Sequence, residues 1–143
     1  MWTRGTGRLH ARTRAGRGGG NITLPHKEKA ASLLDVRSDS VRRTGACNTF
    51  WGDDQGKVHG DNTDVDGFRR ALNIFLDQSP KGIRALLLGA GGAARAALLG
   101  LIDEGADEVV IYNRTQERAR AIARRIGGEK TRVVPLLHQL DTE

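Results

Sequence analysis

Residues 83–100 read IRALLLGAGGAARAALLG, in which an apolar run leads into a glycine-rich turn and then into a segment of alanine and leucine. An apolar run of this length that ends in glycines is typical of a buried strand. Alanine and leucine are strong helix formers, so the segment after the turn predicts a helix that reaches Gly105. We therefore expect a buried strand at Ile83–Leu88, followed by a tight turn and a helix.

The same alternation continues along the chain. Val109–Tyr112 predicts a second strand, Thr115 is placed to cap a helix at Gln116–Ile126, and a pair of glycines ends that helix. Arg132–Val134 predicts a third strand. Strands that alternate with helices in this way form parallel sheets, so the expected fold class is α/β with the order βαβαβ.

The turn carries a phosphate-binding pattern. Gly89, Gly91 and Ala94 fit GxGxxA at a junction of strand and helix, where glycines allow a tight turn and the close approach of a pyrophosphate. Backbone amides and the positive end of the helix dipole suit phosphate oxygens. These observations predict a dinucleotide-binding unit of the Rossmann type. The residues of the turn expected to contact the cofactor are Gly89, Ala90, Gly91, Gly92 and Ala93.

The end of the second predicted strand indicates which dinucleotide binds. A unit that binds NAD usually has an acidic residue there, which holds the ribose 2′-hydroxyl. This chain has Asn113, Arg114 and Thr115 instead, with Arg118 one helical turn later. Guanidinium groups suit a 2′-phosphate, so we expect these four residues to contact NADP. The alternative for Arg118 is a solvated position on an exposed helix.

The elements upstream are shorter. The sequence predicts a strand at Asn21–Leu24, a helix at Glu28–Leu34, strands at Thr49–Trp51 and Lys57–His59, and an amphipathic helix from Phe68 to Leu76. A polar turn joins the second and third of these strands and brings Asn48 near Gly60. The apolar side of the last helix consists of Phe68, Ala71, Leu72, Phe75 and Leu76.

Four motifs follow one another in a fixed order: GGNITLPHK at 19–27, GACNTF at 45–50, GDNTDVDGF at 60–68, and GAGGAARAAL at 89–98 with the later NRT. Together they resemble the shikimate dehydrogenase family over about residues 19–135. The resemblance implies the remainder of an N-terminal α/β substrate-binding domain plus the first half of a Rossmann NADP-binding domain. The expected ranges are a disordered Arg/Gly-rich tail at 1–18, a partial substrate-binding domain at 19–65, a linker helix at 66–80 and a partial Rossmann domain at 81–143.

The resemblance also implies roles for individual residues. Lys27 matches the family's catalytic lysine, Asp64 its partner aspartate, and Thr23 and Asn48 match substrate-contacting positions. The implied reaction is reversible hydride transfer between NADPH and the carbonyl of 3-dehydroshikimate, which yields shikimate. Lys27 either supplies a proton to the developing alkoxide or stays charged and stabilises it. Each of these residues also has a structural interpretation on local grounds. Lys27 is then a solvated residue of a first helical turn and Asp64 a helix cap, while Asn48 belongs to a turn and Thr23 to a strand.

Composition argues against several other classes. The net charge of +6 comes largely from five arginines in residues 1–20, which contain no acid, so the charge is weak support for nucleic acid as a partner. No apolar run is long enough for a membrane span. Cys47 is the only cysteine, which excludes an intrachain disulfide and favours a core position, and no metal site is expected. The family context and the single cysteine favour a cytoplasmic location. The resemblance also implies a homodimer for full-length members of the family.

The chain also departs from the family pattern. The serines that grip the substrate carboxylate and the second Rossmann half have no counterpart, so we expect open strand edges, marginal stability and an inactive chain. A quinate or shikimate dehydrogenase is an alternative, although such enzymes typically prefer NAD and carry an acid after the second strand. Two further alternatives are a nonenzymatic remnant that binds NADP weakly and, last, a nucleic-acid tether formed by residues 1–20.

Overall fold

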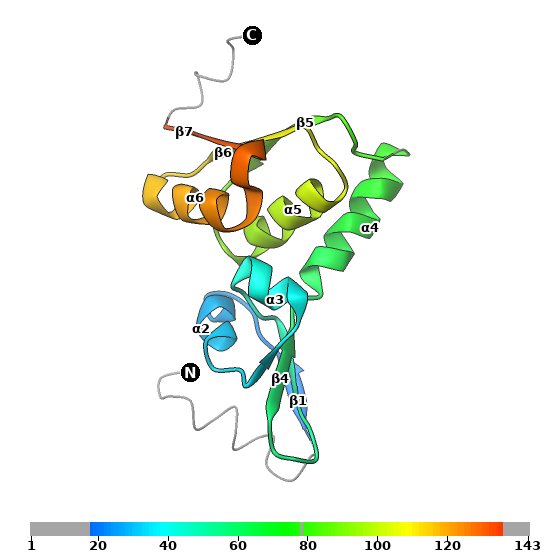
Figure 1. Ribbon diagram of the computed structural model, residues 1–143, viewed down its shortest axis with the longest axis vertical. Coiled ribbons are helices and arrows are strands. Elements are labelled where there is room, and N and C mark those ends of the chain that lie inside the picture. Colours follow the sequence, from blue (N-terminus) through cyan, green and yellow to red (C-terminus); the bar gives the residue numbers. More distant parts are fainter. Residues whose placement is uncertain (1–17, 78, 136–143) are drawn as a thin grey trace. The chain divides into compact units, whose positions relative to one another are not determined.

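The computed structural model describes residues 18–77 and 79–135 (Figure 1). The chain divides after Thr63 into two compact units, which are described one at a time. Most of the tail expected at 1–18 and the end of the range expected for the Rossmann domain lie outside the described residues. In the described part, no helix is long and apolar enough to cross a membrane, and no group of His, Cys, Asp and Glu side chains could hold a metal ion.

Unit 1 is built on a four-stranded sheet with the order β1-β3-β4-β2. Strand β3 pairs antiparallel with β1 and β4, and β2 pairs parallel with β4. The elements are β1 (Gly19–Asn21), α2 (Lys27–Ala31), β2 (Val36–Arg37), α3 (Asp39–Thr44), β3 (Thr49–Gly52) and β4 (Val58–Asp61). The predicted hairpin is confirmed, since Phe50 lies opposite Gly60 and the Asn48 amide donates to the Asp61 carbonyl at 3.0 Å.

Two sequence predictions for unit 1 are wrong in detail, and one helix was missed. Strand β1 ends at Asn21 instead of Leu24, because the chain turns there and the His26 amide donates to the carbonyl of Thr23. Helix α2 stops at Ala31, three residues before the predicted end. Helix α3 was not predicted at all. It begins after Ser38, whose side chain accepts a hydrogen bond from the Val41 amide, and ends at Gly45, whose φ is 67°.

The core of unit 1 is a cluster of buried apolar side chains from its strands, helices and loops. It consists of Ile22, Ala30, Ala31, Leu34, Val41, Cys47, Phe50 and Val58. Cys47 is fully buried, as the sequence predicts. Gly60 lies so close to Leu34 and Cys47 that a Cβ at this position would stand 2.9 Å from the Cys47 Sγ. The packing therefore requires glycine at the centre of β4.

Unit 2 confirms the predicted βαβαβ order. Its three strands form a parallel sheet with the order β5-β6-β7. The elements are α4 (Asp64–Leu76), β5 (Arg84–Leu88), α5 (Gly92–Asp103), β6 (Glu108–Tyr112), α6 (Gln116–Ile122), the π-helical η1 (Ala123–Gly127), the 3-10 helix η2 (Gly128–Lys130) and β7 (Thr131–Val134). The helix predicted at Gln116–Ile126 is thus one helical segment whose last turn widens.

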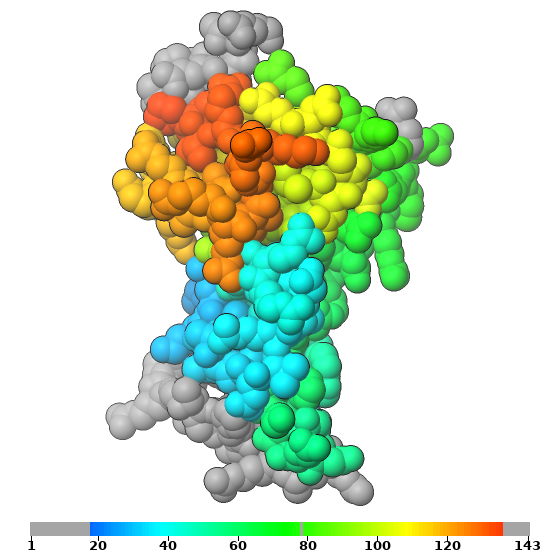
Figure 2. All heavy atoms as spheres, viewed as in Figure 1, coloured from blue at the N-terminus to red at the C-terminus, as the bar shows by residue number. Residues whose placement is uncertain are grey.

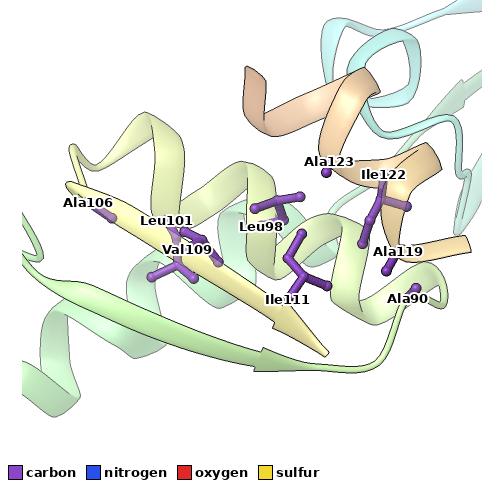
Figure 3. Close-up of a cluster of buried hydrophobic side chains, with 9 residues drawn as sticks. All are labelled: Ala90, Leu98, Leu101, Ala106, Val109, Ile111, Ala119, Ile122 and Ala123. Atoms are coloured by element: carbon purple, nitrogen blue, oxygen red, sulfur yellow. The ribbon is translucent and has the colours of Figure 1, made fainter. Parts of the chain in front are cut away.

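One face of this sheet packs against α5 and α6 (Figure 3). Val109 and Ile111 of β6 meet Leu98 and Leu101 of α5 and Ile122 of α6. Each fully buried side chain of this size contributes roughly 1.5–3 kcal/mol to the free energy of folding. This apolar layer therefore supplies the largest part of the packing in unit 2.

The opposite face shows that the prediction of a fully buried β5 is wrong. Residues along β5 alternate in burial, and the exposed fractions of Leu86 and Leu88 are 47% and 64%. Alternate side chains of a strand point to opposite faces, and the helices of the described part pack on the other one. On the exposed face, Glu108 of β6 forms ion pairs with Arg84 and Arg132, each with an N–O distance of 3.0 Å.

Helix α4 lies beside α5 along one margin of unit 2 (Figures 1 and 2). Phe68 and Leu72 pack against the core of the unit, as predicted. Gly100 of α5 allows this approach, because a Cβ there would stand 2.7 Å from the Phe68 Cδ1. The prediction fails for Ala71 and Phe75, which are exposed, Phe75 to 84%, and the neighbouring Ile74 is 81% exposed. The apolar stripe of α4 is therefore wider than the surface that covers it.

Candidate functional site

The glycine-rich turn joins β5 to α5 at the carboxyl end of the parallel sheet. Gly89 has a φ of 110°, a conformation that suits only glycine, and its amide donates to the Tyr112 carbonyl of β6 at 2.8 Å. A Cβ built at Gly89 or Gly91 would meet no atom within 4 Å. The turn is thus open on the side where these side chains would stand, and a ligand can approach its backbone.

Helix α5 starts at this turn. Gly91 is its N-cap residue and has no side chain that could cap the first amides of the helix. Ala90 and Gly92 are buried, whereas Ala93 is exposed in the first turn. Unsatisfied amides at the start of a twelve-residue helix favour an anion. The turn and the helix start therefore have the features of a pyrophosphate site.

The second group of predicted cofactor residues follows β6. Because Leu88 pairs with Tyr112, the chain leaves β5 and β6 side by side, with Gly89 next to Asn113. The Asn113 side chain donates to the Thr115 carbonyl at 2.7 Å and orders the loop. Thr115 occupies the N-cap position of α6, although its hydroxyl makes no capping bond. Arg114 and Arg118 are exposed.

The residue types at this loop fit a phosphate better than a ribose hydroxyl. Asparagine, arginine and threonine follow β6, and the first acid, Glu117, comes only inside α6. Arginine pairs with phosphate through two parallel hydrogen bonds, whereas a carboxylate at the end of the strand would repel it. The arrangement can hold a dinucleotide that carries an additional phosphate on its ribose.

In unit 1, the backbone brings three predicted site residues to one end of the sheet. The Ile22 amide, next to Thr23, donates to the Asn48 carbonyl at 2.7 Å. The Lys27 carbonyl accepts from the Cys47 amide at 2.9 Å, so the start of α2 is tied to the segment before β3. Lys27 is half-buried as the first residue of α2, and Thr23 is exposed.

The side chain of Asn48 has a defined orientation. Its Nδ2 donates to the Thr63 Oγ1 at 3.0 Å, and its Oδ1 accepts from the Thr63 amide at 3.0 Å. The Thr49 hydroxyl also donates to this Oδ1, at 3.1 Å. Sequence reasoning missed Thr63 as a neighbour of Asn48. The signal was present, since Thr63 belongs to the same motif as Asp64, which opens α4 in unit 2.

Asp61, two residues before Thr63, was also missed by the sequence analysis. Its Oδ1 accepts hydrogen bonds from the hydroxyls of Ser38 and Ser40 and from the Asn62 amide. Burial by itself would raise the pKa of Asp61, but the hydrogen bonds from Ser38, Ser40 and Asn62 outweigh it and lower the pKa. Asp61 is therefore an anion held by three donors at neutral pH.

The parallel βαβαβ unit with its glycine turn makes unit 2 a dinucleotide-binding unit of the Rossmann type. Residues 71–142 match the family model described as shikimate / quinate 5-dehydrogenase, and residues 7–50 match the model of the shikimate dehydrogenase substrate binding domain. The chain belongs to the shikimate / quinate 5-dehydrogenase family. The second match begins at residue 7, within the range expected to be a tail, so the boundaries of that tail stay a prediction.

Individual relatives agree with this assignment. The shikimate dehydrogenase (NADP(+)) of Methylocella silvestris is 48% identical over 114 residues, which are 76% of this chain and 39% of the relative. A structure of shikimate 5-dehydrogenase from Thermus thermophilus with NADP(H) and shikimate matches with a TM-score of 0.74 and 42% identity, over 91% of this chain and 47% of that one. Quinate dehydrogenase from Corynebacterium glutamicum with NAD matches with a TM-score of 0.79 and 31% identity, over 93% and 48%.

The chain therefore spans about two fifths of the length of the curated relatives it matches. The α/β fold predicted from the sequence is confirmed. The roles of the individual site residues stay predictions.

Proposed function

We propose that this chain carries the lysine-bearing part of the substrate site and the phosphate-binding half of the cofactor site of an NADP-dependent shikimate dehydrogenase. The activity of such an enzyme is the reversible reduction of 3-dehydroshikimate to shikimate. Family membership and the 42% identity to the Thermus thermophilus enzyme, described with NADP(H) and shikimate, support it. The observation that carries the proposal is the glycine turn beside an Asn-Arg-Thr loop, at neighbouring carboxyl ends of β5 and β6.

In this proposal NADPH supplies the hydride. The backbone amides of Gly91, Gly92 and Ala93 would bind its pyrophosphate, since the N-cap glycine provides no side chain to cap the start of α5. Arg114 and Arg118 would bind the 2′-phosphate, and Asn113 and Thr115 would shape the loop that holds it. The open space at Gly89 and Gly91 supports this fit, because a side chain there would occupy the path of the ligand.

The substrate would be oriented by polar side chains of unit 1. The Asn48 amide and the Thr23 hydroxyl would hydrogen-bond to ring hydroxyls of shikimate. Lys27 would donate to the oxygen at which negative charge develops, either by transferring a proton or by remaining an ammonium ion. Asp64, which matches the family's partner aspartate, would accept a hydrogen bond from the substrate hydroxyl. We also infer a cytoplasmic location and, for complete members of the family, a homodimer.

A second candidate is an NAD-dependent dehydrogenase that uses quinate as well. The similarity to quinate dehydrogenase of Corynebacterium glutamicum favours it. The loop after β6 argues against it, because Arg114 stands where an acid would receive the ribose hydroxyls of NAD.

Titration of the purified chain with NADPH and NADH, followed by cofactor fluorescence, tests the proposal. We expect NADPH to bind at least about tenfold more tightly, since charge-assisted hydrogen bonds to a phosphate contribute about 1.5–3 kcal/mol. Arg114→Glu should abolish this preference. The control is Arg120→Ala, because Arg120 lies on the helix that follows this loop and donates to the Gln116 Oε1 instead. Equal affinities for the two cofactors, unchanged by Arg114→Glu, would contradict the proposal.

Calorimetric titration with shikimate and with quinate separates the remaining alternatives. Binding of shikimate, weakened by Lys27→Ala, supports the enzyme hypothesis. Binding of NADPH without binding of either acid would identify a nucleotide-binding module instead.

A further inference from the structure

Two serines and an aspartate meet where α3 packs against the end of β4. Ser38 and Ser40, at the start of α3, each place the hydroxyl oxygen 2.7 Å from the Asp61 Oδ1. The Asn62 amide donates to the same oxygen at 2.8 Å and to the Ser40 Oγ at 3.0 Å. Asp61 thus receives three hydrogen bonds on one carboxylate oxygen, and each of them fixes the chain directly after β4.

Asn62 is held on its other side too. It is only 1% exposed, and its Nδ2 donates to the Thr44 Oγ1 at 3.1 Å. Thr44 is fully buried at the end of α3, and its hydroxyl donates to the Ser40 carbonyl at 2.6 Å. Asn62 is therefore hydrogen-bonded to residues at both ends of α3. These bonds restrict the position of the next residue, Thr63.

Thr63 in turn is hydrogen-bonded to the side chain of Asn48, a predicted substrate contact. Its amide and its hydroxyl meet the Oδ1 and the Nδ2 of Asn48, both at 3.0 Å. The Asn48 amide also donates to the carbonyl of Asp61 itself. An asparagine side chain can turn over, which exchanges its donor and acceptor ends. Because the Thr63 amide can only donate a hydrogen bond, it favours the orientation in which the Asn48 Oδ1 faces it.

We propose that Asp61, together with Ser38 and Ser40, is a positioning residue that fixes the Asn62–Thr63 backbone and thereby the orientation of the Asn48 side chain. The value of this orientation for substrate binding rests on the proposed function, in which Asn48 contacts shikimate. The positioning itself is a property of unit 1 and does not depend on any ligand.

Nuclear magnetic resonance of the full chain tests the proposal through two amides. The Thr63 amide, bonded to the Asn48 Oδ1, reports positioning, and the Cys47 amide, bonded to the Lys27 carbonyl, reports the general stability of unit 1. In Asp61→Asn and Ser40→Ala we expect exchange of the Thr63 amide to accelerate about tenfold while the Cys47 amide is unchanged. The side-chain amide signals of Asn48 should shift in the same variants.

Two controls complete the design. Ser40→Thr keeps the hydroxyl and should restore the parent behaviour. Asp39→Asn removes a charge of the same kind from the exposed side of α3 and should change neither amide. Equal acceleration of both amides in Asp61→Asn, or no change in either, would overturn the proposal.

A shikimate titration of the same variants gives the functional readout. Asp61→Asn should weaken binding of shikimate about tenfold and leave binding of NADPH unchanged. If the parent chain binds no shikimate, the substrate assignment fails, and the amide measurements alone still decide whether Asp61 positions Asn48.

Discussion

The two units position their candidate site residues by different means. In unit 2 the ligand would meet backbone: a glycine at φ 110°, the unsatisfied amides at the start of α5 and a loop set by strand register. In unit 1 the ligand would meet side chains whose orientation depends on other side chains, as Asn48 depends on Thr63 and Thr63 on Asp61. A backbone site follows directly from the regular fold, whereas a side-chain site needs a set of matched polar partners.

The cores differ in a parallel way. Unit 2 concentrates its packing on one face of a sheet and leaves Leu86 and Leu88 of the other face exposed. Unit 1 packs small residues so closely that a single methyl group at Gly60 would collide with Leu34 and Cys47. The stability of unit 2 should therefore fall when a side chain on its packed face is truncated. The stability of unit 1 should fall when a side chain in its core is enlarged.

The largest effect is expected from Leu98→Ala in α5. Leu98 is fully buried in the layer between the sheet and the helices, so its truncation should lower the free energy of unfolding by about 3 kcal/mol. Leu86→Ala removes the same atoms from the exposed face of β5 and should cost less than about 1 kcal/mol. Urea denaturation followed by circular dichroism measures both. Similar losses in the two variants would show that both faces are packed.

A smaller effect, of opposite sign at two positions, is expected for glycine substitutions. Gly60→Ala forces a Cβ against Leu34 and Cys47 and should destabilise unit 1 by about 1–3 kcal/mol. Gly67→Ala in α4 meets no atom within 4 Å and should stabilise by about 0.5–1 kcal/mol, because glycine is a poor helix former. Fluorescence of Trp51 follows the first variant and circular dichroism the second. Stabilisation by Gly60→Ala would contradict the close packing around β4.

The smallest effect concerns pH. The pKa of Asp61 is lowered in the folded chain, so the folded state binds this proton less tightly than the unfolded state. The hydrogen bonds therefore stabilise fully above the unfolded pKa of about 4, and this contribution is lost as the pH falls through the folded value. At neutral pH the free energy of unfolding of the parent should exceed that of Asp61→Asn by about 1 kcal/mol. This difference should become smaller at acidic pH. Urea denaturation at several pH values measures this difference. The control is Asp39→Asn, whose free energy of unfolding should change with pH as that of the parent does.

Much of unit 2 could be predicted from the sequence, because its elements are set by local patterns. Apolar runs, glycines and helix formers alternate with the period of a βαβαβ unit, and the turn at Gly89 follows from its motif. What could not be predicted was the exposure of Leu86 and Leu88. An apolar run shows that a strand can be buried, but neighbours distant in sequence decide whether it is.

Unit 1 was harder to predict, for a physical reason. Helix α3 has six residues and β2 has two, which is too short for a periodic pattern to emerge. Ser38 and Asp61 are 23 positions apart, and nothing local in either motif requires that they meet. Motif resemblance pointed to Lys27, Asn48 and Asp64, yet the residues that hold Asn48 in place became visible only in the folded chain.

Cys47 allows the opening of the unit 1 core to be followed by chemical labelling. Its thiol is fully buried and donates to the Thr49 carbonyl, and burial raises its pKa. Only a thiolate in contact with solvent reacts with an alkylating reagent, so the folded chain must open around β3 before the label attaches. Since Cys47 is the single cysteine of the sequence, every label found on the protein records one opening of this core.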